Sequence, residues 1–231
     1  ALSCPKVKTN QDEKHIKTVL RAKEGEELTL CDGAGTDYRC RILSLEQGVE
    51  TEILSAAACE TEPYTQITLY QGLPKADKME WIIQKCVELG VDRIVPVATE
   101  RTIVKLEKKE GRKLERWQKI AEAAAKQSGR GKIPCVGPSV LTFAQAAAEA
   151  AKMDGALIPY EKEEHCGIRT FVQRGTGRHI GVFIGPEGGF SEMEIQMAEE
   201  SGILPVTLGK RILRTETAGM VAIALLLYEL G

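Results

Sequence analysis

The chain has 231 residues, of which 43% are hydrophobic and 28% charged, a mixture typical of an ordinary globular protein. Its length suits one large domain or two smaller ones. No apolar run reaches the roughly 18–20 residues that a transmembrane helix needs, and the first residues lack a signal-peptide pattern, so we expect a soluble, cytoplasmic protein with no membrane partner.

Charge is unevenly distributed along the chain. The 31 basic residues nearly balance the 33 acidic ones, for a formal net charge of -2. Between residues 100 and 132, however, basic residues outnumber acidic ones, and a smaller basic excess lies between residues 6 and 23. Local patches set the field that a phosphate backbone meets. Two interpretations therefore stay open, a nucleic-acid surface and a solvated helix face. The seven cysteines include no CxxC pair, so neither a metal site nor a disulfide framework is expected.

The first part of the chain predicts a small β-rich domain. Short alternating runs are separated by turn residues such as Asp32-Gly33 and Gly48. We expect a short helix followed by three strands, at residues 15–20, 28–30, 38–43 and 49–54.

After Pro63 the pattern changes to alternating strands and helices, which predicts a mostly parallel sheet covered by helices on both faces. Capping boxes at Thr142 with Gln145 and at Ser191 with Glu194 mark two helix starts, and Gly90 marks a helix end. Strands are expected at residues 67–70, 93–97, 156–159, 179–184 and 205–208, and helices at 79–89, 113–127 and 217–230.

Two segments carry most of the chemical information. Residues 184–190, IGPEGGF, follow a predicted buried strand and precede a capped helix. Glycines there permit close approach of backbone to a ligand, although a demanding strand-to-helix turn would need them too. Residues 208–218, LGKRILRTETA, combine Arg214 and Glu216 with apolar neighbours, as a pocket does; simple helix capping by Glu216 is the alternative.

Five motifs in the same order resemble the ribosomal RNA small subunit methyltransferase E family, and the resemblance covers the chain from about His15 onward. They are residues 72–80 (GLPKADKME), Lys85 through residues 88–91 (ELGV), residues 122–124 (EAA) with Gln127-Ser128, IGPEGGF and LGKRILRTETA. The family usually begins with a short basic-aromatic strand, whereas this chain begins ALSCP.

The resemblance implies an α/β fold of the SPOUT class, a parallel sheet with a C-terminal trefoil knot, preceded by a PUA-like β-barrel domain that binds RNA. The implied boundaries are residues 1–62 for the barrel and 63–231 for the methyltransferase domain. It also implies a homodimer, with the last helix as an interface element, and S-adenosyl-L-methionine as the cofactor. Nothing in periodicity or spacing itself indicates a knot.

Residue by residue, the resemblance implies three loops that bind S-adenosyl-L-methionine, with backbone groups of Leu208, Gly209 and Leu213 holding the adenine. The expected cofactor-binding residues are Leu157, Pro159, Tyr160, Ile184, Gly185, Pro186, Glu187, Gly188, Gly189, Leu208, Gly209, Ile212, Leu213 and Thr217.

The implied reaction is methylation of N3 of a uridine in 16S ribosomal RNA of the small subunit. Because N3 must lose a proton, the enzyme needs a proton acceptor and a group that stabilises charge on the uracil oxygens. Arg214 is expected to stabilise that charge, and Glu216 to handle the proton or orient Arg214. The expected RNA-binding residues are His15, Lys17, Arg21, Lys75, Lys78 and Arg101.

Two alternatives remain open from the sequence. A SPOUT methyltransferase could act on another ribosomal or transfer RNA site, such as a ribose 2′-hydroxyl. A non-catalytic RNA-binding assembly factor could have kept the fold, although the intact glycine turn argues against loss of the cofactor site.

Overall fold

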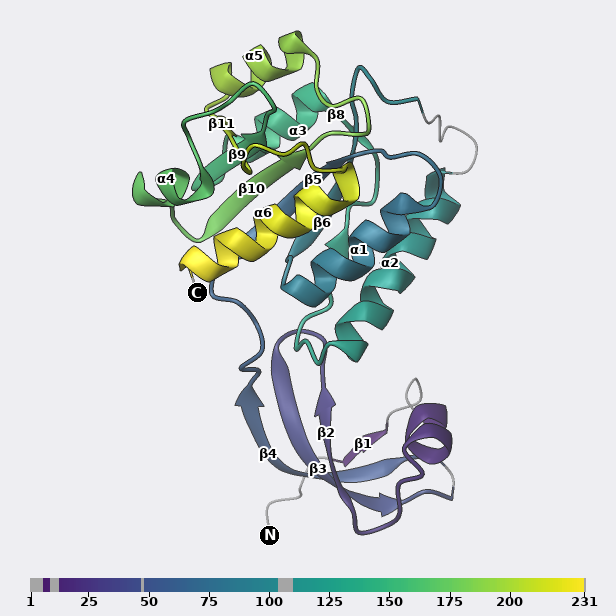
Figure 1. Ribbon diagram of the computed structural model, residues 1–231. Coiled ribbons are helices and arrows are strands. Elements are labelled where there is room, and N and C mark those ends of the chain that lie inside the picture. The colour runs from purple at the N-terminus through teal and green to yellow at the C-terminus, as the bar shows by residue number, and fades with distance from the viewer. Residues whose placement is uncertain (1–5, 9–12, 47, 104–109, 231) are drawn as a thin grey trace. The chain divides into compact units, whose positions relative to one another are not determined.

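The computed structural model describes residues 6–8, 13–46, 48–103 and 110–230 (Figure 1). The chain forms two compact units, each described by itself. The first comprises residues 1–62 with 130–132, and the second comprises residues 63–129 with 133–231. Each unit has its own hydrophobic core. No helix within the described ranges is long and apolar enough to cross a bilayer.

The described residues of the first unit form a four-stranded antiparallel sheet in the order β1-β4-β3-β2. Its small core contains Ile16, which lies between the first two strands along the chain, Ile42 in the third strand, and Val49 just before the fourth. The expected β-rich domain is therefore confirmed. Its strands are β1 (Lys6–Lys8), β2 (Glu27–Cys31), β3 (Thr36–Ser44) and β4 (Glu50–Ala58).

Two local features of this unit differ from expectation. The predicted short helix is a π-helical turn, η1 (His15–Val19), and β1 pairs with β4 although the residue pattern predicted no strand there. The opening residues ALSCP, where the sequence departs from the family pattern, lie outside the described residues.

The described part of the second unit contains a seven-stranded sheet in which every paired neighbour is parallel. The order is β11-β9-β10-β5-β6-β7, with β8 beside β6. This confirms the expected parallel sheet. The strands are β5 (Gln66–Gly72), β6 (Arg93–Ala98), β7 (Cys135–Val136), β8 (Leu141–Thr142), β9 (Gly155–Pro159), β10 (His179–Ile184) and β11 (Leu204–Val206).

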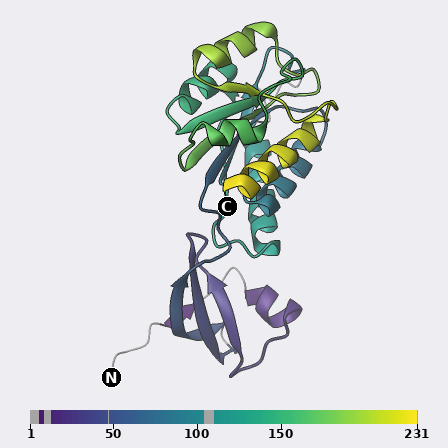
Figure 2. The same cartoon turned by 60° about the vertical axis from the view of Figure 1, so that its left-hand side comes forward.

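Helices cover both faces of this sheet, because its strands alternate apolar side chains toward each face. One core cluster joins the sheet to α1 (Lys78–Leu89), α2 (Glu110–Gln127), α4 (Ile168–Gln173) and α6 (Thr215–Leu230). A second cluster joins it to α3 (Phe143–Ala150) and α5 (Glu192–Glu200). Figures 1 and 2 show α6 beside α1 on one face and α3 and α5 on the other.

Local sequence signals explain where several helices begin and end. Both predicted capping boxes form, with Thr142 accepting from the Gln145 amide and Ser191 from the Glu194 amide. Gly90 ends α1 in the left-handed conformation, at φ 109°. The six-residue α4 was not predicted; its N-cap is Gly167, which has no side chain to signal a helix start.

Candidate functional site

The three loops expected to bind the cofactor meet at one edge of the sheet. β11, β9 and β10 are parallel neighbours, so their carboxyl ends lie side by side. The amide of Tyr160, in the first loop, donates to the carbonyl oxygen of Val206 at 2.9 Å, at the start of the third loop. This edge is where α/β sheets bind small molecules.

The glycine turn after β10 requires glycine because backbone segments approach each other closely. A Cβ placed on Gly72, at the end of β5, would lie 2.6 Å from Cδ of Pro186. A Cβ on Gly185 would lie 3.0 Å from Cα of Gly189, and Gly189 itself has φ +65°. There is no room for a side chain at Gly72 or Gly185, and the turn therefore packs directly against the end of β5.

A chain of hydrogen bonds from buried side chains connects the same turn to β5 and α6. Gln71 is fully buried at the end of β5, and its Nε2 donates to the carbonyl oxygen of Gly72 at 2.9 Å and to Oγ1 of Thr215 at 3.0 Å. The Thr215 hydroxyl donates to the carbonyl oxygen of Gly185 at 2.6 Å. β5, the glycine turn and the start of α6 are thereby linked.

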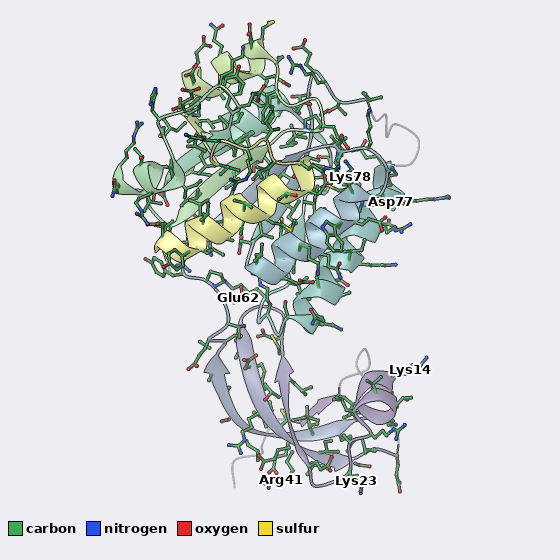
Figure 3. All side chains as sticks on the ribbon, viewed as in Figure 1. Lys14, Lys23, Arg41, Glu62, Asp77 and Lys78 are labelled. Atoms are coloured by element: carbon green, nitrogen blue, oxygen red, sulfur yellow. The ribbon has the colours of Figure 1, made fainter. Side chains whose placement is uncertain are left out.

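Glu187 at the tip of the turn is held by the segment that follows β5. Its carboxylate accepts hydrogen bonds from the Lys75 amide at 3.1 and 3.2 Å and lies 2.9 Å from Nζ of Lys78. Partial burial alone would raise the pKa of Glu187, but the hydrogen bonds from Lys78 and from backbone amides bring it below its usual range. The hydrogen bond to Glu187 raises the pKa of Lys78. Figure 3 labels Lys78 at the start of α1.

The two residues expected to be catalytic stand at the beginning of α6 but do not pair with each other. Arg214 is exposed, and its carbonyl oxygen accepts from the Thr217 and Ala218 amides at 2.9 and 2.8 Å. Glu216 instead places Oε2 3.5 Å from Nζ of Lys78. That oxygen is buried and accepts no hydrogen bond from the described residues.

Two cavities flank the glycine turn, and Arg101 lines both. The first, about 220 Å³, is lined by Leu73, Lys75, Arg101, Ile103, Pro186, Glu187 and Gly188. The second, about 280 Å³, is lined by Glu100, Arg101, Tyr160, Glu161, Lys162, Phe190, Ser191, Glu192 and Met193. Arg101 also donates from Nη1 to the carbonyl oxygen of Gly188 at 2.8 Å. A cation and open space thus lie directly beside the turn.

The remaining expected cofactor residues differ in exposure. Leu157 and Ile184 are buried in strands, and Ile212 is 88% exposed. The Gly209 amide already donates to the Thr207 hydroxyl at 3.2 Å, which leaves its carbonyl group for a ligand. Intermediate exposure is shared by Pro159, Tyr160, Leu208, Leu213 and Thr217.

The site has the features that a bound S-adenosyl-L-methionine molecule would need. Gly209, at φ +106°, has nothing within 4 Å of the position that a Cβ would take, and Gly189 has only Oε2 of Glu161 at 4.0 Å, so backbone is open to a ligand on two loops. Oε1 of Gln71 and Oε2 of Glu216 are buried without a hydrogen-bond donor among the described residues. Orphaned buried acceptors are uncommon and often mark functional sites.

The RNA-binding residues expected in the first unit are only partly described. The side chain of His15 lies outside the described residues. Lys17 pairs with Glu13 at 2.6 Å, and Arg21 is exposed with φ +51°. The structure places both cations on the segment before β2 and gives no ligand contact for either.

Three residues shape the glycine turn although this role was not expected for them: Gln71, and Gly72 and Thr215, which belong to two of the five motifs. One signal for Gln71 was available. In the sequence, this polar residue directly follows the largely apolar run at residues 67–70, and the structure buries its side chain fully. A polar side chain at the carboxyl end of a buried parallel strand indicates a structural or ligand-binding role.

Comparison with known proteins decides the family. The family model for an RNA methyltransferase domain matches residues 60–227, and that for an RNA methyltransferase PUA domain matches residues 9–53. The ribosomal RNA small subunit methyltransferase E of Bacillus subtilis is 35% identical over 228 residues, which cover 96% of this chain and 89% of the relative. The chain belongs to the ribosomal RNA small subunit methyltransferase E family.

Further methyltransferase E proteins agree with this assignment in sequence and in structure. The Synechocystis protein of this name is 36% identical over 212 residues, covering 91% of this chain and 68% of the relative. The crystal structure of the Neisseria gonorrhoeae methyltransferase E, bound to S-adenosyl methionine, matches with a TM-score of 0.85 and 37% identity. That match covers 97% of this chain and 92% of the gonococcal chain.

Proposed function

We propose that this protein transfers the methyl group of S-adenosyl-L-methionine to N3 of a specific uridine in 16S ribosomal RNA of the small subunit. The observation that carries the proposal is the intact glycine turn at residues 185–189, built against Gly72 and hydrogen-bonded to Thr215 at the carboxyl edge of the sheet. It stands in a chain that belongs to the methyltransferase E family.

The three loops after β9, β10 and β11 would hold the methyl donor, which supplies a methyl group on a positively charged sulfur. Open backbone at Gly189 and Gly209 would approach its adenosine, and apolar Leu208 and Leu213 would contact the adenine. Holding donor and base in line would itself lower the barrier.

At the uridine, the bond from N3 to its proton breaks and the bond from N3 to the methyl carbon forms, while the carbon–sulfur bond breaks. Glu216 would accept the proton, since its Oε2 is buried, accepts no hydrogen bond from the described residues and has the Lys78 ammonium only at 3.5 Å. Arg214 is exposed directly before α6, two residues from Glu216, and would stabilise the negative charge that develops on the uracil oxygens.

The target nucleotide would enter beside the glycine turn. The cavity of about 220 Å³ combines the apolar side chains of Leu73, Ile103 and Pro186 with the cations of Lys75 and Arg101. Apolar walls suit a base that has left the stack, and the cations suit its phosphates. The PUA domain, with Lys17 and Arg21, would contact RNA elsewhere on the subunit, in the cytoplasm where ribosomes assemble.

We further propose a homodimer that uses α6. Leu225 and Tyr228 are exposed on this helix, at 41% and 82%, whereas Ile223 on the same helix is fully buried inside the unit. Large apolar side chains exposed on one helix are typical of an interface. The expected trefoil knot remains a prediction from the resemblance.

Transfer of a labelled methyl group tests the proposed function. The protein is incubated with labelled S-adenosyl-L-methionine and either unmodified small subunits or unmodified transfer RNA. We expect label in the small-subunit RNA, and a loss of at least roughly tenfold in rate for Glu216→Gln with cofactor affinity retained. Label in transfer RNA alone would point to another target, and the absence of both transfer and cofactor binding would point to an assembly factor.

A further inference from the structure

Lys78 is the one lysine in the described residues whose ammonium lies between carboxylates from two separate segments of the site. Nζ lies 2.9 Å from Oε1 of Glu187 in the glycine turn and 3.5 Å from Oε2 of Glu216 at the start of α6. The side chain keeps 34% of its exposure, less than a freely solvated lysine would. Its ammonium is therefore already paired with protein carboxylates, unlike that of a surface lysine available to bind a phosphate.

The backbone before α1 has an unusual conformation that brings Lys78 to Glu187. Ala76 has φ 54°, a conformation that residues other than glycine seldom adopt. The chain turns there so that the Lys75 amide and the Lys78 ammonium both face Glu187. Asp77, at the N-cap of α1, makes no capping hydrogen bond with its side chain. Neither helix capping nor an ideal turn explains this geometry, and strain of this kind is concentrated at functional sites.

We propose that Lys78 is a positioning residue of the methyl transfer, which fixes the carboxylates of Glu187 and Glu216 relative to each other, and that it does not contact the RNA phosphates. This inference rests on the proposed function and replaces the expectation that Lys78 binds RNA. It assigns to one side chain the link between the turn that would hold the methyl donor and the carboxylate that would accept the proton.

Electrostatics give the reason for a cation at this point. Two carboxylates that face one site repel each other, and a buried carboxylate oxygen without a partner is costly. One ammonium carries three N–H donors, enough to reach both carboxylates and keep one position free. With Lys78 removed, Glu187 would keep only the Lys75 amide and other backbone amides, and Glu216 would lose its nearby cation.

The test compares Lys78→Met with Lys78→Arg, because methionine keeps an unbranched chain without charge and arginine restores the charge. Lys85→Met is the matched control; Lys85 stands on the same helix and pairs with Glu88 at 2.9 Å, away from the turn. For Lys78→Met we expect kcat to fall by roughly tenfold to a hundredfold, the range of one charge-assisted hydrogen bond. The KM for RNA and its salt dependence should stay unchanged, and arginine should recover part of kcat.

A phosphate contact would give the opposite pattern and overturn the proposal: kcat unchanged, a higher KM for RNA, and a salt slope smaller by about one. A second readout does not depend on the RNA target. The dissociation constant for S-adenosyl-L-methionine, measured by calorimetry, should rise several-fold in Lys78→Met and in Glu187→Gln but not in Lys85→Met. If the wild type transfers no methyl group, the proposed function fails, while this binding comparison still decides the role of Lys78.

Discussion

The hydroxyl of Thr215 donates a hydrogen bond of 2.6 Å to the carbonyl oxygen of Gly185, which joins the first residue of the last helix to the glycine turn 30 residues earlier. The same hydroxyl accepts from Nε2 of Gln71. Because Gln71 and Thr215 are buried and Gly185 is half-buried, water cannot replace these bonds readily when one partner is removed. The shape of the turn therefore depends on residues outside its own segment.

Replacing Thr215 with valine should loosen the glycine turn. Valine has nearly the same shape but leaves the Gly185 carbonyl and the Gln71 amide without this partner, at a cost of about 1–3 kcal/mol. We expect a lower melting temperature and a dissociation constant for S-adenosyl-L-methionine raised about tenfold. Thr215→Ser keeps the hydroxyl and serves as the control. Equal affinity in the valine and serine variants would show that the hydrogen bond does not hold the cofactor turn.

Adding one methyl group at Gly72 should damage the same turn sterically. The new Cβ would lie 2.6 Å from Cδ and 2.8 Å from the nitrogen of Pro186, so backbone must move. Overpacking of this kind costs about 1–3 kcal/mol. Thermal unfolding of Gly72→Ala should show this loss. Gly111→Ala is the matched control, since Gly111 is in α2 with nothing within 4 Å of its Cβ position, and there alanine should be neutral or stabilising. Equal melting temperatures for the two variants would contradict the close approach of Gly72 to Pro186.

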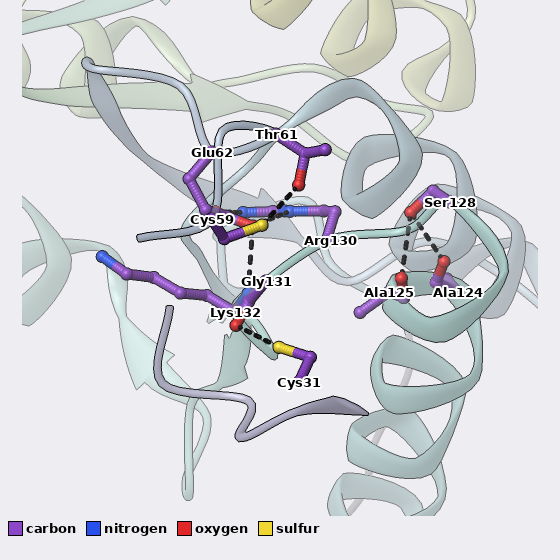
Figure 4. A network of polar contacts seen from close by, with 10 residues as sticks. All are labelled: Cys31, Cys59, Thr61, Glu62, Ala124, Ala125, Ser128, Arg130, Gly131 and Lys132. Carbon is purple, nitrogen blue, oxygen red and sulfur yellow. Dashed lines mark hydrogen bonds and ion pairs between the residues drawn. The ribbon is translucent and has the colours of Figure 1, made fainter. Parts of the chain in front are cut away.

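The first unit depends on a nearly buried ion pair. Glu62 accepts from Nη2 of Arg130 at 2.7 Å and from the Lys132 amide at 3.0 Å, and the two side chains keep only 12% and 4% of their exposure (Figure 4). Burial alone would raise the pKa of Glu62, but the hydrogen bonds and charges of Arg130 and Lys132 together outweigh it and lower the pKa. Because breaking one side of a buried pair costs about 3–5 kcal/mol, Glu62→Gln should be clearly less stable at pH 7.

The lowered pKa also fixes the sign of the pH dependence. The contribution of Glu62 is complete above the unfolded glutamate pKa, about 4.3, and is lost as the pH falls through the lower folded value. Urea unfolding should therefore give a difference in the free energy of unfolding between wild type and Glu62→Gln that is smaller at pH 3 than at pH 7. The exposed Glu60 supplies the control, Glu60→Gln, which should change stability little at either pH. A difference in unfolding free energy that is the same at both pH values would contradict a stabilising ion pair of Glu62 with Arg130.

Charge introduced on α6 should dissociate the proposed dimer. Tyr228 is 82% exposed and lies on the helix that also exposes Leu225. Burying a glutamate there without a partner should cost several kcal/mol of association. Light scattering after size-exclusion chromatography at micromolar concentration should give a dimer mass for wild type and a monomer mass for Tyr228→Glu. Met197→Glu, on α5 across the sheet, should stay dimeric. A wild-type monomer would contradict the proposed dimer.

Much of the fold could be predicted because its signals are local. The capping boxes at Thr142 and Ser191 and the left-handed end at Gly90 stand where the sequence places them. The last strand is displaced from residues 205–208 to Leu204–Val206, since strand ends have no comparable marker. The two-residue strands β7 and β8 and the short α4 are too brief to produce a periodic pattern.

The site could be predicted as a set of segments but not as a set of contacts. The glycine turn and the segment before α6 were found from their residue types. The bridge from Lys78 to Glu187 and Glu216 spans more than 100 residues of sequence, and no local pattern encodes such a pairing. The same holds for Gln71 with Thr215, which are 144 residues apart. Only the folded sheet brings these partners to one edge.

Locating the transferred methyl group tests the proposed reaction most directly. Small subunits without the modification are incubated with the protein and S-adenosyl-L-methionine, and their RNA is digested to nucleosides and to oligonucleotides for mass spectrometry. We expect 3-methyluridine at a single position of 16S ribosomal RNA, formed at least roughly tenfold more slowly when Glu216→Gln replaces the wild type. A methyl group on a ribose, on another base or at many positions would contradict it.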